Sequence, residues 1–525
     1  MHENRETSGT SRSNQNRDRS EKADSRTADR HVPEESDRAV VPVKLPNKEE
    51  QSSAEAEEGR ARAKENIAHS NTSPTQSGKR VSQGLRGVRQ AARERKQTRF
   101  TALLHHLTVD LLRESFLALK RQAAPGVDGV TWREYETGLE NRLSDLHSQV
   151  HRGAYRAQAS RRVYIPKADG RQRPLGVAAL EDKIVQQAVV TILNEIYEVD
   201  FKGFSYGFRP GRSPHQALDA LSMGLVRKRV KWVLDADIRG FFDQMSHEWT
   251  MKFVQHRVGD PRIVRLIQKW LQAGVVEEGQ WSETKMGTPQ GAVASPLLAN
   301  VYLHYVFDVW VEVWRKKVAQ GNVIVVRYAD DLVVGFEKRA EAERFLKEFR
   351  ERLAKFGLEL HSEKTRLIEF GRYAALNRKQ HGKEKPETFT FLGFTHYCGK
   401  RRNGTFTVWR KTAKKRLVAK LQELKMELCR RRHEPIASVG AWLRKVVLGY
   451  YQYHAVPGNL PQLAIFRYRL GRLWRRVVQR RSQRGWILQE RWNRILTRWI
   501  PPPRVLHPYP SVRFDARYPR WKPHA

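Results

Sequence analysis

The spacing of apolar residues changes several times along this chain, and each change predicts a different element. Helical spacing first occurs at residues 100–122, where leucines recur every three or four positions. Similar spacing predicts helices at about 135–150, 181–197, 247–257, 260–273, 296–319 and 339–356. Short apolar runs rich in β-branched residues predict strands at 163–165, 175–177 and 232–238. Strands interspersed with helices in this way predict an α+β fold.

One stretch combines strand signals with a possible reaction centre. In residues 322–336, two apolar runs flank Tyr328-Ala-Asp330-Asp331, which predicts a β-hairpin with an acidic pair at its turn. Adjacent carboxylates beside buried strands repel each other unless a cation lies between them. Carboxylate oxygens suit Mg²⁺, which takes its other ligands from water and phosphates. The hairpin therefore predicts a phosphoryl-transfer site, and the alternative is a solvated Asp-Asp turn.

A site for two metal ions needs a third carboxylate. The segment from Trp232 onward offers Asp235, Asp237 and Asp243. Asp237 is favoured because it ends the apolar run, where a rigid strand would present its side chain. His361 and His396 have no partner at metal-ligand spacing and are interpreted as surface or structural residues.

The two ends of the chain differ from its middle. Residues 1–77 hold almost no large apolar side chains, so they are predicted to be disordered, with order beginning near Phe100. The basic segment 81–99 is predicted to be a helix or an arm that touches nucleic acid. Residues 400–525 hold 31 Lys/Arg against 5 Asp/Glu, with helices predicted at about 412–432, 436–454 and 461–480. The Pro- and Arg-rich end from residue 501 is predicted to be an extended tail.

Charge and composition limit the partners and the compartment. The net charge of +40 and the pI near 10.4 indicate polyanionic partners, with an anionic membrane as the competing partner. After residue 400, the excess of positive charge with interleaved aromatic residues favours nucleic-acid binding over a merely solvated basic face. The sequence has no run of 18 apolar residues and no apolar leader, so neither a membrane span nor a signal peptide is predicted. The two cysteines, Cys398 and Cys429, exclude paired-Cys zinc modules and favour a reducing, cytoplasmic location. A Walker-type phosphate loop is absent from the sequence.

Several short motifs occur in a fixed order between about residues 90 and 500. They are Tyr164-Ile-Pro-Lys167 with Arg173-Pro-Leu-Gly176, Tyr206-Gly-Phe-Arg-Pro-Gly-Arg-Ser213, Asp237-Ile-Arg-Gly-Phe-Phe-Asp243, Gly287-Thr-Pro-Gln-Gly291 with Ser295-Pro-Leu-Leu-Ala-Asn300, Tyr328-Ala-Asp-Asp331, Gly357-Leu-Glu-Leu-His-Ser-Glu-Lys-Thr365, Phe391-Leu-Gly-Phe394 and Trp442-Leu-Arg-Lys-Val-Val-Leu-Gly-Tyr-Tyr-Gln-Tyr453. Each motif is weak by itself, but the ordered set is specific. The chain resembles the reverse transcriptase–maturases encoded by group II introns, of the type that lacks a C-terminal His-Asn-His endonuclease.

The resemblance implies a right-hand polymerase with fingers, palm and thumb. It divides the chain into a leader (1–80), an N-terminal fingers extension (81–160), fingers and palm (161–398), a mainly helical basic thumb or X domain (399–500) and a basic tail (501–525). The implied activity is an RNA-directed DNA polymerase with two Mg²⁺ ions that also binds its intron RNA, assists splicing and copies the intron into cDNA. Its implied partners are intron RNA, an RNA template, a DNA primer or target and dNTPs, with no membrane.

The resemblance also assigns roles to individual residues. Asp237, Asp330 and Asp331 would hold the metal ions. The nucleotide would contact Lys167, Arg173, Phe242, Gln290 and Lys364, with Phe242 as the steric gate against a ribose 2′-hydroxyl and Lys364 as a proton donor to pyrophosphate. The primer and template would contact Tyr328, Gly291, Phe391 and Gly393. RNA would contact Arg209, Arg212, Trp442, Arg444, Tyr450 and Tyr451.

Two alternatives and one departure bear on this interpretation. A stand-alone bacterial reverse transcriptase, such as a retron, CRISPR- or defence-associated enzyme, is the first alternative; Gln290-Gly291 argues against a diversity-generating enzyme, and no Val-Thr-Gly motif of the retron type occurs in the final region. The second is an RNA-binding splicing factor with a degenerate polymerase, which the three intact aspartates disfavour. Ala292 stands where the family has a second glycine, which would strain the backbone if φ is positive there.

Overall fold

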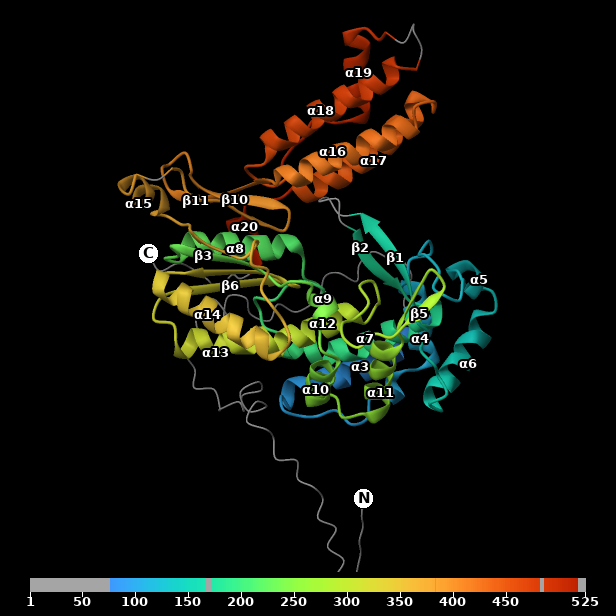
Figure 1. Cartoon of the computed structure of the whole chain (residues 1–525). Coiled ribbons are helices and arrows are strands. Elements are labelled where there is room, and N and C mark those ends of the chain that lie inside the picture. Colours follow the sequence, from blue (N-terminus) through green and yellow to red (C-terminus); the bar gives the residue numbers. More distant parts are fainter. Residues whose placement is uncertain (1–75, 167–171, 383, 482–485, 518–525) are drawn as a thin grey trace, which may run out of the picture. The chain divides into compact units, whose positions relative to one another are not determined.

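The computed structural model describes residues 76–166, 172–382, 384–481 and 486–517, all within the compact unit Pro46–Ala525 (Figure 1). The predicted disordered segment 1–77 therefore lies almost wholly outside the described residues. The first described element is helix α3 (Gln76–Glu94), so the prediction that order begins near Phe100 is wrong. Leu85, Val88 and Ala92 are buried, and α3 packs on α7 (Leu180–Asp200). This basic segment is thus a packed helix.

Residues 100–122 do not form one helix. A short 3-10 turn (Leu104–His106) precedes α4 (Val109–Ala118), and Phe100 instead bridges Val258. The carboxylate of Asp260 accepts hydrogen bonds from the N–H groups of Leu103 and Leu104, which holds the chain out of a helix there. The next helical segment is also divided, into α5 (Trp132–Glu136) and α6 (Leu139–His151), because Gly138 between them is left-handed with φ +74.

A small sheet carries the first predicted hairpin. Its strands are β1 (Ser160–Pro166), β2 (Gln172–Val177), β4 (Val275–Glu277) and β5 (Gln280–Ser282), in the order β2-β1-β4-β5. The antiparallel pairing of β1 with β2 confirms the hairpin predicted from the sequence. The parallel pairing of β1 with β4 was not predicted, since it joins segments more than 100 residues apart.

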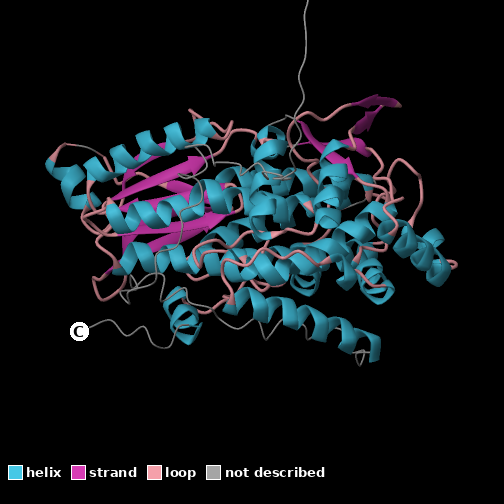
Figure 2. Cartoon of the chain, turned by 90° about the horizontal axis from the view of Figure 1, so that it is seen from below, coloured by secondary structure: helices cyan, strands magenta, loops and turns pink. Residues whose placement is uncertain are grey.

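The central sheet has the strand order β6-β7-β3-β8, with every neighbouring pair antiparallel. Its strands are β3 (Trp232–Asp237), β6 (Val323–Tyr328), β7 (Asp331–Phe336) and β8 (Arg366–Glu369). Consecutive residues of β6 and β7 are buried, which indicates cover on both faces of these strands. Helix α8 (Pro214–Arg227) contacts β6, and α14 (Arg339–Lys355) contacts β3 and β7; Figure 2 shows helices lying along these strands.

The helices between β3 and β6 match the predicted positions closely. They are α9 (Phe241–Gln244), α10 (His247–Arg257), α11 (Pro261–Gln272), α12 (Ser295–Leu303) and α13 (Val309–Lys317). The predicted helix 296–319 is interrupted by a π-helical segment, His304–Asp308. Such segments are rare and occur often at functional sites.

A third sheet and a bundle of helices follow. Strands β9 (Phe389–Phe391), β10 (Phe394–Lys400) and β11 (Phe406–Thr412) pair antiparallel after the short helix α15 (Ala374–Gln380). The division expected at residues 398/399 therefore falls inside strand β10. The helices α16 (Lys414–Arg430), α17 (Ile436–His454), α18 (Leu460–Gln479) and α19 (Gln489–Trp499) surround a core of their own.

The prediction of an extended tail after residue 501 is wrong for residues 510–517; residues 501–509 form no helix or strand, and 518–525 lie outside the described residues. Pro510–Arg517 forms helix α20, which packs on α8. Phe514 is buried in the same apolar core as Val233 and Val333, and Arg513 donates two hydrogen bonds to Asp219 at 2.6 and 2.8 Å. These tertiary contacts stabilise a helix that the Pro-rich composition disfavoured. Across the described ranges, no helix has the length and apolarity that a membrane crossing requires.

Candidate active site

The two acidic segments meet on neighbouring strands of the central sheet. The loop between β6 and β7 consists of Ala329 and Asp330, and Asp331 begins β7. Ala329 adopts a left-handed φ of +58, as tight two-residue hairpins require at one loop position. Asp237 ends β3 and is the direct cross-strand partner of Asp331. Three carboxylates from segments about 90 residues apart in sequence thus gather at one end of the sheet.

The electrostatics of this end reflect crowded negative charge. The pKa of Asp331 is raised to about 7. The first cause is desolvation of its carboxyl group, and the second is repulsion from Asp330, Asp237 and Asp235. Burial, and then the charge of Asp237, raise the pKa of Asp330 as well. Burial also raises the pKa of Asp235, to about 6, although Arg366 opposes this shift. Charge of this kind favours a bound cation.

A lysine supplies one cation in the present arrangement. The Nζ of Lys364 donates a hydrogen bond of 2.6 Å to Oδ2 of Asp237, and the N–H of His361 donates to the Asp237 carbonyl. Among the residues that the structure describes, no three Asp, Glu, His or Cys side chains are grouped so as to hold a metal ion as they stand. The donor set nevertheless fits Mg²⁺ in kind, because it consists of carboxylate oxygens at the ends of two strands and in the tight turn beside them, and Mg²⁺ takes its remaining ligands from water or phosphate.

A buried arginine anchors the acidic hairpin, and the sequence reasoning missed it. Arg327 has no solvent exposure and donates two hydrogen bonds to Asp308, at 2.7 and 2.6 Å, in the π-helical segment. Its Nη1 also donates to the side chain of Asn300 and to the carbonyl of Ala329 in the loop. Arg327 thus ties the loop that carries Asp330 to two helices. An arginine inside an apolar strand was the available sequence signal, because such a charge needs a buried partner.

The segment Tyr206–Ser213 packs directly against the same hairpin. The N–H of Tyr206 donates to the Arg327 carbonyl, and Asn300 donates to the carbonyl of Gly207. A Cβ on Gly207 would lie 2.3 Å from the Ala329 nitrogen, so glycine is required for this approach. Phe208 follows with a positive φ of 60 and an exposed ring that lies edge-on to Phe242, 6.3 Å between centroids.

The loop Gly287–Gly291 contacts both helix α9 and strand β2. Thr288 donates through its N–H to the Phe242 carbonyl, while the carbonyl of Gln290 accepts from the N–H of Gly176 in β2. Gly291 has φ +114, and a Cβ there would lie 2.9 Å from the Gly176 oxygen. Ala292, the departure from the family pattern, is not among the described residues with positive φ, so the strain considered for it does not arise.

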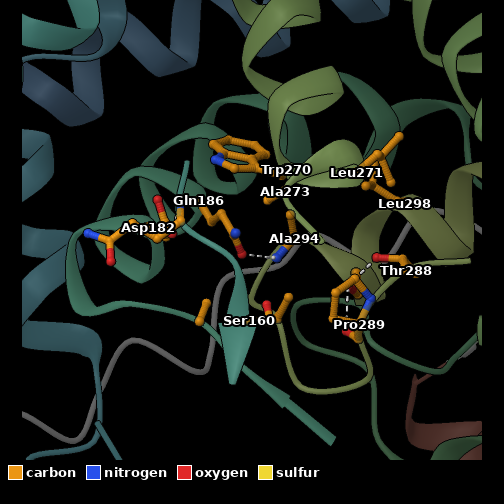
Figure 3. Close-up of a pocket in the computed structure, with 14 residues that line it drawn as sticks. Ser160, Asp182, Gln186, Trp270, Leu271, Ala273, Thr288, Pro289, Ala294 and Leu298 are labelled. Atoms are coloured by element: carbon orange, nitrogen blue, oxygen red, sulfur yellow. Dashed lines mark hydrogen bonds between the residues drawn. The ribbon is translucent and has the colours of Figure 1, made fainter. Parts of the chain in front are cut away.

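Figure 3 shows the hydrogen bonds that fix this loop to the start of α12 and to α7. Thr288 and Ser295 share a hydrogen bond, Ser295 also donates to the Pro289 carbonyl, and Gln186 of α7 accepts from the N–H of Ala294. These groups border a cavity of about 10 Å³, which has room for about one water molecule. The cavity is too small for a nucleotide, so we interpret it as part of the loop's support.

Two of the predicted nucleotide contacts, Arg173 and Lys364, lie near the acidic end. Lys167 lies outside the described residues. Arg173, on β2, is exposed and close enough to Asp330 for its charge to oppose the rise in that carboxyl's pKa. Phe242 and Gln290 are partly exposed. The structure therefore brings Arg173 near the carboxylate cluster, while the nucleotide contacts of Phe242 and Gln290 stay predictions.

The predicted primer and template contacts need one correction. Phe391 is only 3% exposed and packs in the same apolar core as Val233 and Val333, so its ring is not open to a nucleic-acid strand. Gly393 has φ +81 in the turn before β10, where Tyr453 of α17 donates to the Leu392 carbonyl at 2.8 Å. Arg416 of α16 adjoins this turn and opposes the raised pKa of Asp331. Arg416 and Tyr453 are site neighbours that sequence reasoning missed.

The predicted RNA contacts differ in their access to solvent. Arg209 is buried, and its guanidinium donates hydrogen bonds to Glu198 and to two backbone carbonyls. Tyr451 is also buried, and its hydroxyl donates to the Pro501 carbonyl. These two residues are corrected to structural roles, because their polar groups are already bonded inside the protein. Arg212, Trp442 and Tyr450 are partly buried, each beside another ring or cation, and Arg444 is exposed.

Comparison with known proteins defines the class. The model of the family "Reverse transcriptase (RNA-dependent DNA polymerase)" matches residues 165–396, which carry the acidic cluster and the loops around it. Protein YkfC of Escherichia coli (strain K12) is 36% identical over 261 residues, 43% of this chain and 68% of that protein. The chain belongs to the reverse transcriptase family, whose members are RNA-directed DNA polymerases.

Within this class, the chain is related to proteins of group II introns. Group II intron-encoded protein LtrA of Lactococcus lactis subsp. cremoris is 40% identical over 166 residues, 31% of this chain and 27% of LtrA. Nuclear intron maturase 2, mitochondrial, of Arabidopsis thaliana is 30% identical over 109 residues, 20% of this chain and 15% of that protein. Because these matches span under a third of either relative, the activities of the whole relatives do not transfer directly.

Proposed function

We propose that this protein is a group II intron reverse transcriptase that extends a DNA primer on an RNA template at Asp237, Asp330 and Asp331. The observation that carries the proposal is the cross-strand pairing of Asp237 with Asp331, with Asp330 in the adjoining turn. Carboxylates held on rigid strands are the ligands that nucleotidyl transfer needs. The third sequence candidate, Asp243, is exposed on α9 and pairs with no strand of the sheet.

These three aspartates would hold two Mg²⁺ ions, which when bound activate the primer 3′-hydroxyl and stabilise the charge on pyrophosphate. Arg173 and Lys167 would neutralise the triphosphate of the incoming dNTP. Lys364, already on Asp237, would give a proton to the leaving pyrophosphate. Phe242 would exclude the ribose 2′-hydroxyl with its partly exposed ring.

The same proposal assigns the larger parts of the chain. Residues 81–160 would extend the fingers, residues 161–398 would form fingers and palm, and the helices from α16 onward would form the thumb. The excess of Lys and Arg after residue 400 supports binding of intron RNA through phosphate contacts. Through that binding the protein would assist splicing and copy the intron into cDNA.

Primer extension tests the catalytic assignment. Asp330→Asn keeps the size of the side chain and removes its charge, so it should lower the extension rate about 10³-fold or more. Asp243→Asn is the matched control and should stay within a few-fold of the parent. RNA binding by filter retention should persist in both variants, which separates lost catalysis from lost folding. Undiminished extension by Asp330→Asn contradicts the assignment.

The intron-specific part needs a separate experiment. Purified protein should speed splicing of a precursor RNA that carries its own intron, and a domain V-like RNA hairpin should lie a short way downstream of the reading frame. RNA affinity should fall steeply as salt rises, because phosphate contacts release counterions. If splicing is not stimulated, or if affinity is flat in salt, the maturase role fails while the polymerase role stands.

A further inference from the structure

A basic groove lies at the end of the central sheet opposite the aspartates. Its volume is about 540 Å³, and its walls come from α8, the β10–β11 turn and the start of α20. Arg227 ends α8 shortly before Trp232, which begins β3, and Arg372 follows β8 just beyond Glu369, the partner of Trp232. Asp237 stands at the other end of β3, about 17 Å away along the strand. The groove is therefore separate from the proposed reaction centre.

The charged groups of the groove are of one sign. Within the described part of the chain, its lining includes Arg227, Arg372, Lys400 and Arg401 and no acidic residue. Arg227 pairs with Asp515 beside the groove at 2.9 Å. Arg372, Lys400 and Arg401 are exposed, and no carboxylate among the described residues lies within 4.0 Å of them. Clustered cations of this kind attract a polyanion.

A smaller chamber of about 30 Å³ adjoins the groove and shares Met223, Val226, Arg401 and Ser511 with it. Two buried donors border this chamber, the Oγ of Ser222 and the Nη1 of Arg410, and neither has a hydrogen-bond partner in the described structure. Asp219 accepts hydrogen bonds from both Arg410 and Arg513, so one carboxylate faces two buried or half-buried guanidinium groups. Unpaired buried donors and surplus positive charge both favour an acceptor with negative charge.

An aromatic surface lies beside these cations. Tyr509 is 54% exposed and lines the chamber together with Trp409, and Phe406 lines the outer groove. Sites for single-stranded nucleic acid combine a positively charged groove with aromatic rings on which bases stack. A free inorganic anion would make no use of these rings.

We propose that this groove, the α20 groove, binds a segment of single-stranded nucleic acid outside the polymerase site. The phosphates lie against Arg372, Lys400 and Arg401, and one base stacks on Tyr509. The inference goes beyond the proposed function, because it concerns a second site at the far end of the sheet. Helix α20 forms one wall of this site, which gives the C-terminal segment a role in binding.

Photo-crosslinking tests the proposal. An oligouridylate of about eight nucleotides containing 4-thiouridine should crosslink to peptides spanning residues 400–410 and 505–511. The triple variant Arg372→Ala, Lys400→Ala and Arg401→Ala should lower this crosslink about tenfold. The matched control is Lys347→Ala, Arg350→Ala and Lys355→Ala, which removes the same charge from the exposed face of α14 and should leave the yield unchanged.

Two further arms make the result decisive. Tyr509→Ala, at an exposed ring, should lower the crosslink, while Tyr509→Phe should keep it. In the second arm, inorganic phosphate or dATP is added as a competitor at the same phosphate concentration as the oligonucleotide. Full displacement of the oligonucleotide would indicate a small-anion site and overturn the proposal. So would a crosslink that is absent from these peptides or unchanged in the triple variant.

The outcome is independent of the catalytic assignment. Asp330→Asn should crosslink at the α20 groove like the parent protein, and the triple variant should extend a short primer–template at the parental rate. If Asp330→Asn loses extension and the parent protein gives no crosslink at the groove, the second site is refuted while the catalytic assignment stands.

Discussion

Lys364 and Asp237 form a hydrogen-bonded ion pair across two segments that are 127 residues apart, with Nζ 2.6 Å from Oδ2. The lysine comes from the loop after α14, and the aspartate ends β3. Asp237 also faces Asp331, so one carboxylate meets a cation and a second acid. The pair thus links the acid most central to the proposed chemistry with the proposed proton donor.

Replacement of Lys364 separates charge from proton transfer. Lys364→Met should lower the extension rate about 10²-fold, because general acids contribute about this much. Lys364→Arg keeps the positive charge but is a poor proton donor at neutral pH, so it should remain slow while binding dNTPs as the parent does. Single-turnover extension with saturating dNTP makes the measurement. Full activity of Lys364→Arg would leave only a charge role for this residue.

Phe242 should control the choice of sugar. Phe242→Val shortens a partly exposed ring beside Phe208 and should raise ribonucleotide incorporation relative to deoxynucleotide about tenfold or more. Phe242→Tyr keeps the ring and should keep the discrimination. The ratio of kcat/KM for dNTP and rNTP on one primer–template reports the effect. An unchanged ratio in Phe242→Val places the gate elsewhere.

Arg327 should matter for both stability and activity. Arg327→Met leaves Asp308 buried without its partner, which should cost about 3–5 kcal/mol of unfolding free energy. The double variant Arg327→Met with Asp308→Leu should recover part of that stability. It should not recover the extension rate, because the carbonyl of Ala329 has lost its donor. Denaturant unfolding and primer extension measure the two effects, and equal recovery of both would exclude a positioning role.

Magnesium binding should depend on pH through Asp331. Its pKa in the folded protein is raised from 3.8 to about 7, so the folded state holds this proton more tightly than the unfolded chain. In metal-free protein, the contribution of this group to stability is therefore present at low pH and is lost as pH rises through about 7. Mg²⁺ binds the ionised carboxylate, so its stabilising effect should grow over the same range.

Thermal unfolding with and without Mg²⁺ at pH values from about 5 to 8 measures this dependence. Asp331→Asn is the control, since it removes the titrating group, and it should flatten the change in the Mg²⁺ effect. A Mg²⁺ effect that is equally large at pH 5 and pH 8 in the parent protein would contradict the account.

The parts of the site that depend on local patterns could be predicted from the sequence. The two apolar runs in residues 322–336 were enough to predict the hairpin and the position of Asp330 and Asp331 between them, because strands and tight turns are set by near neighbours. The apolar run before Asp237 likewise predicted β3. The choice of Asp237 over Asp235 and Asp243 is supported by its cross-strand partner Asp331, a pairing that a sequence cannot display.

Errors arose where distant contacts override local signals. Arg209 belongs to a basic motif, yet Glu198 draws its guanidinium inside. Residues 510–517 follow a Pro-rich segment, yet Asp219 and the core around Phe514 stabilise α20 there. Arg416 approaches Asp331 only because α16 packs beside the turn at Gly393.

Local chemistry along the chain determined which side chains are acidic, which segments form strands and which partners the surface charge attracts. The three-dimensional packing decided which acids face each other, which cations are buried with partners and which remain open to an anion. The physical reason is one of range: backbone preferences act over a few residues, whereas Coulomb interactions and burial act between whatever groups the fold brings together.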